Sequence, residues 1–146
     1  MRSESEKHRI VLDTKPLMKL FAQEDGWEEV QKILVRAEAG EVEAAISVVS
    51  LTEIYCRYLQ EKRPDLAEAR TDSLRYATYL KKLEIGEEVA VLAGKLKGKH
   101  AVSIADAFIA ASAYQERSSI VSDDPDFNKI TEVESHNEKD ILSQLT

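Results

Sequence analysis

The sequence has a single cysteine, which excludes an internal disulfide. A lone Cys56 is typical of a protein kept in a reducing cytoplasm, and because nothing near it would activate a thiolate we expect a small buried side chain. The histidines are scattered and lack the spacing of zinc ligands; they are His8, His100 and His136. These scarcities predict a cytoplasmic protein without a zinc site.

Long apolar runs and excess positive charge are also missing. No run approaches the roughly 18 residues that a membrane span requires, and residues 1–7 lack the apolar core of a secretory signal. The formal net charge of −7 argues against broad nonspecific adhesion to nucleic acid, which needs a basic face. It leaves a nuclease open, because metal ions can neutralise the protein's acids and the substrate's phosphates alike.

What the chain does have is the pattern of one α/β domain. Its 146 residues, 43% of them hydrophobic, suffice for a single domain over residues 1–146 with its own core. Short apolar strands alternate with amphipathic helices, which predicts a mostly parallel sheet. Strands are expected at 10–12, 43–49, 83–85, 119–122 and 131–134, and helices at 17–21, 27–37, 50–59, 66–80, 87–97, 103–116 and 141–145, with Gly98 ending the helix that begins at residue 87.

Four acids fall where a predicted strand gives way to a helix, or in a helix's first turn: Asp13, Glu53, Asp106 and Asp124. Each has an ordinary structural explanation. Ser50-x-x-Glu53 fits the capping-box pattern and Ser103-x-x-Asp106 approximates it, while the other two acids can cap the helices that follow them. Asp106 fits this explanation least, because its helix is apolar on nearly every side and a buried carboxylate is costly without a partner.

Taken together, the four acids predict a metal site. The carboxyl ends of neighbouring parallel strands share one edge of a sheet, which is where ligands bind in open α/β proteins. Carboxylates gathered there repel one another and take up protons unless a cation holds them. Oxygen ligands without thiolate or imidazole suit Mg²⁺ or Mn²⁺, and such ions held by acids commonly serve phosphodiester hydrolysis.

Four segments that carry these acids form a set in a fixed order along the chain. They are Ile10-Val11-Leu12-Asp13-Thr14, Ser47-Val48-Val49-Ser50-Leu51-Thr52-Glu53, Ser103-Ile104-Ala105-Asp106-Ala107-Phe108-Ile109-Ala110-Ala111-Ser112-Ala113 and Ile120-Val121-Ser122-Asp123-Asp124-Pro125-Asp126-Phe127. The set resembles the PIN domain family, especially its VapC-type toxin ribonucleases, and covers nearly the whole chain. The resemblance implies a three-layer α/β/α sandwich, a Mg²⁺- or Mn²⁺-dependent ribonuclease, usually a homodimer, and an antitoxin partner where the protein is a toxin.

By position, the resemblance assigns catalytic and metal-binding roles to Asp13, Glu53, Asp106 and Asp124, with Asp126 as a further metal ligand and Ser122, Thr14 and Lys15 as supporting residues. Asp123 falls at a variable position. The family usually has serine or asparagine where this chain has Lys15. The lysine ammonium can pair with Asp13 and compete with metal, or bind the scissile phosphate as a point charge.

Three basic residues near the predicted site are candidates for contacting the substrate: Lys97, Lys99 and Arg57. The two lysines precede the helix that begins at Ser103, where they also suit the negative end of the preceding helix. Arg57 lies one helical turn beyond Glu53, so it can orient that acid or form a surface pair.

The function expected is therefore a metal-dependent endoribonuclease that acts on RNA, with cleavage of DNA left open. The alternative is a PIN-like dimeric module that binds a protein or RNA with weakened or no catalysis, which Lys15 and the acidic net charge motivate. An aspartyl-phosphate enzyme built on Asp13 is a weaker hypothesis, because Lys15 stands where such enzymes usually carry a second acid.

Overall fold

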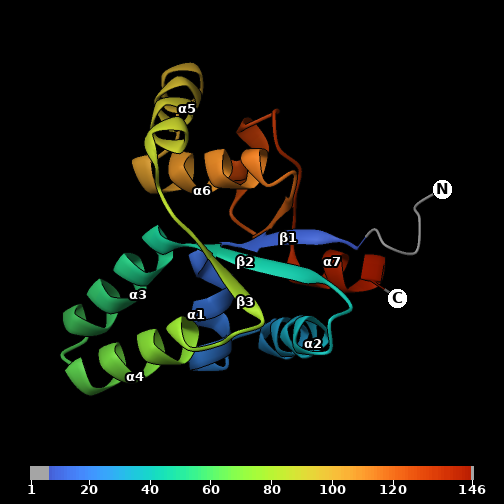
Figure 1. Cartoon of the computed structure of the whole chain (residues 1–146). Helices are drawn as coiled ribbons and strands as arrows, with labels where there is room; N and C mark the ends of the chain where they lie inside the picture. The colour runs from blue at the N-terminus through green and yellow to red at the C-terminus, as the bar shows by residue number, and fades with distance from the viewer. Residues whose placement is uncertain (1–6, 146) are drawn as a thin grey trace.

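The computed structural model describes residues 7–145 as a five-stranded sheet between two layers of helices (Figure 1). The strands are β1 (Arg9–Leu12), β2 (Glu43–Ser47), β3 (Leu80–Leu83), β4 (Ser119–Val121) and β5 (Ser135–His136). Every neighbouring pair is parallel, in the order β3-β2-β1-β4-β5. This confirms the predicted α/β class and makes the sheet entirely, rather than mostly, parallel.

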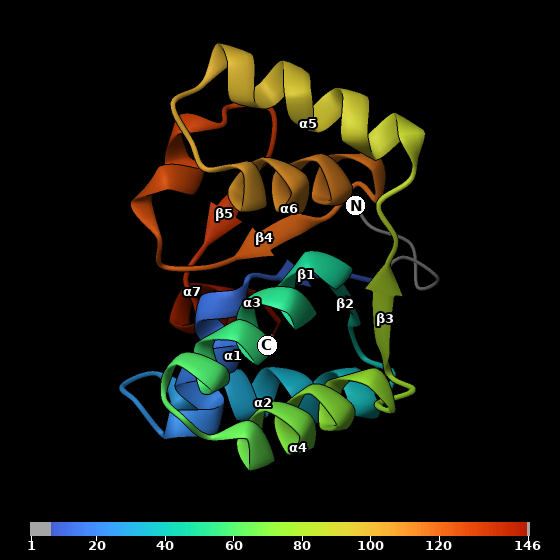
Figure 2. The ribbon, with the colours of Figure 1, turned by 90° about the vertical axis from the view of Figure 1, so that its left-hand side faces the viewer.

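Helices cover both faces of the sheet (Figure 2). Within the described residues they are α1 (Thr14–Ala22), α2 (Trp27–Glu38), α3 (Val48–Gln60), α4 (Pro64–Arg75), α5 (Glu87–Lys99), α6 (Ile104–Gln115), the short 3-10 helix η1 (Pro125–Lys129) and α7 (Glu138–Leu145). α5 and α6 lie over one face, and the other α-helices lie over the opposite face (Figures 1 and 2). The predicted three-layer sandwich is therefore confirmed.

β1 is the central strand, and its sequence shows why. Ile10, Val11 and Leu12 are at most 1% exposed. Side chains alternate between the faces of a strand. Ile10 and Leu12 accordingly pack in the core under α1 to α4, and Val11 packs in the core under α5 and α6. A strand covered on both faces must be apolar throughout, which explains the uninterrupted run.

The order of the strands creates a crevice beside β1. The chain moves outward from β1 to β2 and β3, then returns to place β4 on the other side of β1. Because parallel crossovers are right-handed, this reversal puts the helices of the two halves on opposite faces. The helices therefore diverge at the carboxyl ends of β1 and β4, and ligands bind at such switch points in open α/β sheets.

Several predicted boundaries were wrong because capping decides where a helix begins. The strand expected at 43–49 ends at Ser47, whose Oγ accepts a hydrogen bond from Val49 N at 3.2 Å and starts α3 early. The helix expected at 66–80 runs from Pro64, which suits a first helical turn, to Arg75. Leu80 instead begins β3, which had been expected at 83–85.

The carboxyl-terminal part also differs from expectation. The last strand lies at Ser135–His136 instead of 131–134, α7 begins at Glu138 instead of 141, and α1 begins at Thr14 instead of 17. Cys56 is exposed, contrary to expectation, because it lies on the outer side of α3.

Residues 1–6 and 146 lie outside the described residues, so the expectation about a secretory signal at residues 1–7 falls almost wholly on them. No helix within 7–145 is long and apolar enough to span a membrane.

Gly98 does not end α5, which continues to Lys99. Apart from their own stretch of helix, neither Gly94 nor Gly98 has a heavy atom within 4 Å of the position that a Cβ would take. Alanine at either position should therefore raise the free energy of unfolding by about 0.5–1 kcal/mol, because it lowers the backbone entropy of the unfolded chain without a clash.

Chemical denaturation of Gly94→Ala and Gly98→Ala measures this, with Gly26→Ala as the contrasting variant. Gly26 has φ +99° and a Cβ there would lie 2.0 Å from Glu138 Oε1, so that substitution should destabilise the protein. Destabilisation by Gly98→Ala would contradict a continuous α5.

Candidate metal site

The four predicted acids come from both helical layers and from the central strands. Asp13 directly follows β1, and Asp124 lies three residues after the end of β4. Glu53 is in α3 and Asp106 is in the first turn of α6, on opposite faces of the sheet. The charges of Asp13, Asp124 and Glu53 all act on Asp106, so the structure brings the four acids together beside the switch point.

Asp13 is the most deeply buried of these acids, at 4% exposure. It occupies the N-cap position of α1 without making a side-chain capping hydrogen bond, so capping does not explain it. The Ser122 hydroxyl donates to its Oδ2 at 2.8 Å. Burial raises the pKa of Asp13 to about 6, and the charges of Glu53 and Asp124 add to this, while hydrogen bonds from Ser122 and the backbone of Thr14 oppose it.

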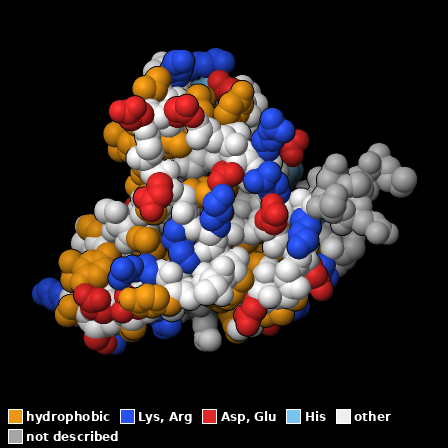
Figure 3. All heavy atoms as spheres, viewed as in Figure 1, with side chains coloured by type: hydrophobic (Ala, Val, Ile, Leu, Met, Phe, Trp, Pro, Cys, Tyr) orange, Lys and Arg blue, Asp and Glu red, His pale blue; other side chains and the backbone are white. Residues whose placement is uncertain are grey.

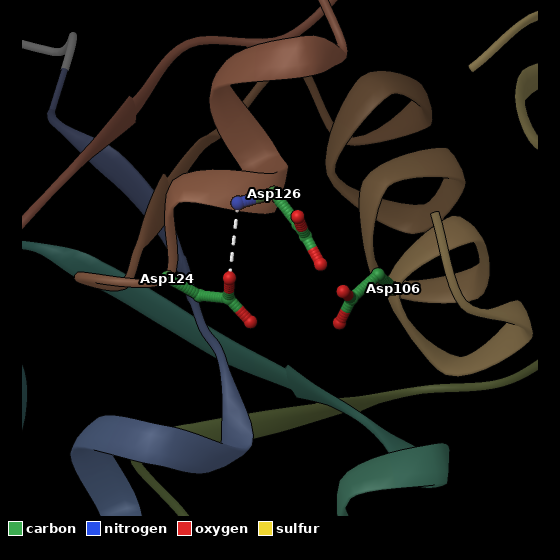
Figure 4. Close-up of side chains that lie close together, drawn as sticks. All are labelled: Asp106, Asp124 and Asp126. Carbon is green, nitrogen blue, oxygen red and sulfur yellow. Dashed lines mark hydrogen bonds between the residues drawn. The ribbon is translucent and has the colours of Figure 1, made fainter. Parts of the chain in front are cut away.

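Asp106 has a pKa that is also raised to about 6, chiefly by burial and then by the charges of Asp13, Asp124 and Glu53, while a hydrogen bond from the Ser103 side chain opposes them. Its backbone N–H donates to Ser103 Oγ at 3.1 Å, so the predicted cap of α6 is present. The cap uses the serine hydroxyl and the backbone of Asp106, and the carboxylate faces the other acids (Figure 4).

Three carboxylates approach most closely: Asp106, Asp124 and Asp126 offer one oxygen each, and these oxygens all lie within 4.8 Å of one another (Figure 4). Asp124 caps η1 by accepting from Asp126 N at 2.9 Å. Two oxygens on opposite sides of one Mg²⁺ are about 4.2 Å apart, so small rotations would suit these side chains to a divalent cation. Asp126 also pairs with Lys129, at 3.0 Å.

Glu53 is held by the residue that follows Asp13. Thr14 Oγ1 donates to Glu53 Oε1 at 2.6 Å and is hydrogen-bonded to Ser50 Oγ at 2.9 Å. The capping-box explanation of Glu53 is wrong, because Ser47 and not Ser50 caps α3. Ser50, fully buried beside this acid, was missed as a supporting residue. Its spacing of three residues from Glu53 places both on one helical face and was the available signal.

Lys15 does not pair with Asp13. Its ammonium lies 3.1 Å from Asp123 Oδ1, and Lys19 lies 2.5 Å from Asp123 Oδ2. Partial burial raises the pKa of Asp123, but the hydrogen bonds from Lys19 and Lys15 outweigh it, so the pKa is below its ordinary value. The acid next to Asp124 is thereby neutralised, whereas the pKa values of Asp13 and Asp106 are raised.

The basic residues proposed to contact substrate each have a local partner. Lys97 Nζ donates to Val102 O at 2.8 Å, Lys99 lies 3.1 Å from Glu132, and Arg57 lies 3.3 Å from Glu61. Arg57 therefore does not orient Glu53. Basic and acidic side chains are interspersed over the face seen in Figure 3, which lacks an unbroken basic surface. Substrate contact by these three residues stays a prediction.

Comparison with known proteins agrees with this geometry. Residues 10–133 match the family model of the PIN domain. No curated protein matches the chain significantly.

Similar folds occur in solved toxin–antitoxin structures. The structure of DNA-bound VapBC from Salmonella typhimurium has a TM-score of 0.71 and 16% identity, covering 90% of this chain and 98% of the other. VapBC2 from Rickettsia felis, bound to a promoter DNA fragment, gives 0.70 and 17%, with coverage of 88% and 98%. VapBC-5 from Mycobacterium tuberculosis gives 0.60 and 25%, with coverage of 88% and 98%. Since the family match covers most of the chain, including all the acids of the site, the chain belongs to the PIN domain family.

Proposed function

We propose that this chain is an endoribonuclease that hydrolyses RNA phosphodiester bonds with Mg²⁺ or Mn²⁺. The observation that carries the proposal is the meeting of Asp13, Glu53, Asp106 and Asp124 at one edge of the sheet, where two of them have pKa values raised to about 6. A fold gathers buried like charges at a cost, and a cation that binds them offsets that cost. Membership of the PIN domain family supports the same reaction.

The donor set fits a hard divalent cation. It consists of carboxylate oxygens without a thiolate or imidazole in the cluster, with Asp106, Asp124 and Asp126 closest together. Asp13 and Glu53 would complete the ligand set directly or through water. When bound, the ion polarises a phosphoryl oxygen and lowers the pKa of water beside it.

The protein's own contribution is to hold these carboxylates in place before the ion arrives. Ser122 holds Asp13, Thr14 holds Glu53, and the N–H of Asp126 holds Asp124. Side chains already fixed by such partners lose little conformational entropy on binding. Because Asp13 and Asp106 retain protons near pH 6, cation uptake should release protons there and weaken as the pH falls.

The alternative function is a dimeric PIN-like module that binds protein or RNA without catalysis. Its main support was Lys15 as a competitor for metal, and that support is reduced because Lys15 pairs with Asp123. Titration with Mn²⁺ by calorimetry discriminates, since absence of binding at millimolar metal would favour the module. The structure does not support the aspartyl-phosphate hypothesis, because Asp13 is only 4% exposed and a phosphoryl donor would have to reach its carboxylate.

We further propose that the protein is the toxin of a toxin–antitoxin pair, acts as a homodimer and works in the cytoplasm. The similarity to VapBC structures supports this. Apolar side chains gather over the projecting α3–α4 arm (Figure 3). Leu59 in α3 is 48% exposed, and Tyr76, the residue that follows α4, is 71% exposed. Exposed apolar surface suits a protein partner better than it suits RNA phosphates.

Asp13→Asn and Asp106→Asn should each lower RNA cleavage by about 100-fold or more, because each removes a charge that the cation requires. Cleavage of a labelled RNA in Mn²⁺, with and without excess EDTA, measures this. Asp65→Asn, which changes an exposed acid paired with Arg63 in α4, should cleave like the wild type. Equal cleavage in excess EDTA would rule out the mechanism.

The metal-free stability should depend on pH through Asp13. Its folded pKa of about 6 exceeds the ordinary 3.8, so the folded state retains the proton longer and loses stability as the pH rises from 4 to 6. Asp13→Asn keeps an acceptor for Ser122 but carries no charge. It should raise the free energy of unfolding at pH 7 by about 1–3 kcal/mol.

Urea denaturation without metal at pH 4 and pH 7 measures this difference. The advantage of Asp13→Asn should shrink toward pH 4, where the carboxyl is protonated in more of both states. Asp65→Asn should show no gain, because Arg63 lowers the pKa of Asp65 in the folded protein. An advantage independent of pH would contradict the assignment.

Expression of the wild-type chain in a bacterial host should slow growth, and expression of Asp106→Asn at the same level should not. Growth curves after induction, with protein levels checked by immunoblot, measure this. Equal growth defects in both strains would point away from toxicity by catalysis.

A further inference from the structure

The loop that follows β4 carries Ser122 and Asp124, and a segment beyond the family match holds it. The match ends at residue 133, whereas β5 and α7 span residues 135–136 and 138–145. β5 lies against β4, and the N–H of Ser122 donates to the carbonyl of His136 at 2.9 Å. The Ser122 hydroxyl also donates to Asp13, so Ser122 alone links β5 to an acid of the proposed site.

A second connection runs from α7 through a chain of ion pairs. Glu138 Oε1 lies 2.7 Å from Lys19 Nζ, and the same ammonium lies 2.5 Å from Asp123 Oδ2. Lys19 comes from α1, so one lysine joins the first helix, the last helix and the loop after β4. Asp123 stands between Ser122 and Asp124 in the sequence, and both of those residues belong to the proposed site.

Glu138 is buried more than a surface ion pair requires. It is 3% exposed, and its second oxygen, Oε2, has no hydrogen-bond partner within the described part of the chain. A buried carboxylate of this kind depends on its cation, because removing one partner of a buried pair leaves an uncompensated charge. Lys19 is the cation that meets this need.

The turn between α1 and α2 makes room for the buried carboxylate. A Cβ on Gly26 would lie 2.0 Å from Glu138 Oε1, and Gly26 has φ +99°, a conformation that side chains disfavour. Gly26 is also the N-cap of α2, so the carboxylate lies at the positive end of that helix as well as in the first turn of α7. Lys19 of α1 and Gly26 at the start of α2 thus both accommodate the Glu138 carboxylate of α7.

We propose that β5 and α7 form a positioning element for the acid cluster, in which Glu138 holds Lys19 and Lys19 holds Asp123, so that Ser122 and Asp124 keep the geometry that binds the cation. This inference rests on the proposed metal-dependent function. Lys19 and Glu138 are positioning residues, since they act on the cation through the loop.

The change in Mn²⁺ affinity distinguishes a positioning role from a purely electrostatic one. Replacing Lys19 removes a positive charge near the cation site, and replacing Glu138 with it removes a negative one, so electrostatics alone predict little change in Mn²⁺ binding. Loss of positioning should instead weaken it, by about 10-fold or more, as is typical when the partners of metal ligands are removed. The variant for the test is Lys19→Met/Glu138→Met, because removing both charges leaves no unpaired buried carboxylate and preserves folding.

Mn²⁺ binding is measured by titration calorimetry on the full chain, and amide hydrogen exchange of residues 122–127 is measured without metal. The double variant should bind Mn²⁺ more weakly and exchange faster at 122–127, with exchange in α5 unchanged. Lys19→Arg, which keeps a cation between the two carboxylates, should retain most of the wild-type affinity. Lys139→Met is the matched control. Lys139 lies in α7 next to Glu138 but pairs with Asp25, so its replacement should change neither measurement.

Unchanged exchange at 122–127 in the double variant, or Mn²⁺ binding as tight as that of the wild type, would overturn the positioning role. A wild-type protein that binds no Mn²⁺ at millimolar concentration would instead overturn the proposed function. The hydrogen exchange experiment would then decide the positioning role by itself, because it is performed without metal.

Discussion

The repulsion between carboxylates at the carboxyl edge of the sheet is the constraint on which the site depends. Asp13 and Asp106 both have a pKa raised to about 6; burial is the largest single cause in each case, and the charges of the neighbouring acids add to it. A cluster that is buried as well as negatively charged is stabilised in two ways, by protons or by a cation. The same physical fact thus suits the cluster to a divalent cation and makes the cluster without a cation costly to fold.

The topology of the sheet explains how the chain brings these acids together without a long insertion. β1 and β4 are neighbours in space although their sequences are more than 100 residues apart, and both end at the switch point. α3 and α6 cover opposite faces, so Glu53 and Asp106 approach the same edge from two sides. The elements that build the site are also those that form the core, which ties the geometry of the acids to the stability of the fold.

Charge is sorted within a few residues of the loop after β4. Asp123 and Asp124 are adjacent in sequence, yet the first is neutralised by Lys15 and Lys19 while the second faces Asp106 and Asp126. This sorting limits the number of negative charges in the cluster. It also means that Lys15, which departs from the usual family residue, neutralises Asp123 and does not take the place of a metal ion among the other acids.

The sequence by itself determined the α/β class and the central strand, and it indicated four acids that come to lie together, because apolar periodicity and short motifs are local properties of the chain. The apolar run from Ile10 to Leu12 suits a strand buried on both faces, and Asp106 is conspicuous in an apolar helix. The tertiary structure alone decided that Leu80 belongs to a strand and that Glu138 reaches Lys19. Those outcomes depend on partners 30 to more than 100 residues away, and no local pattern encodes which distant groups will meet once the core has formed.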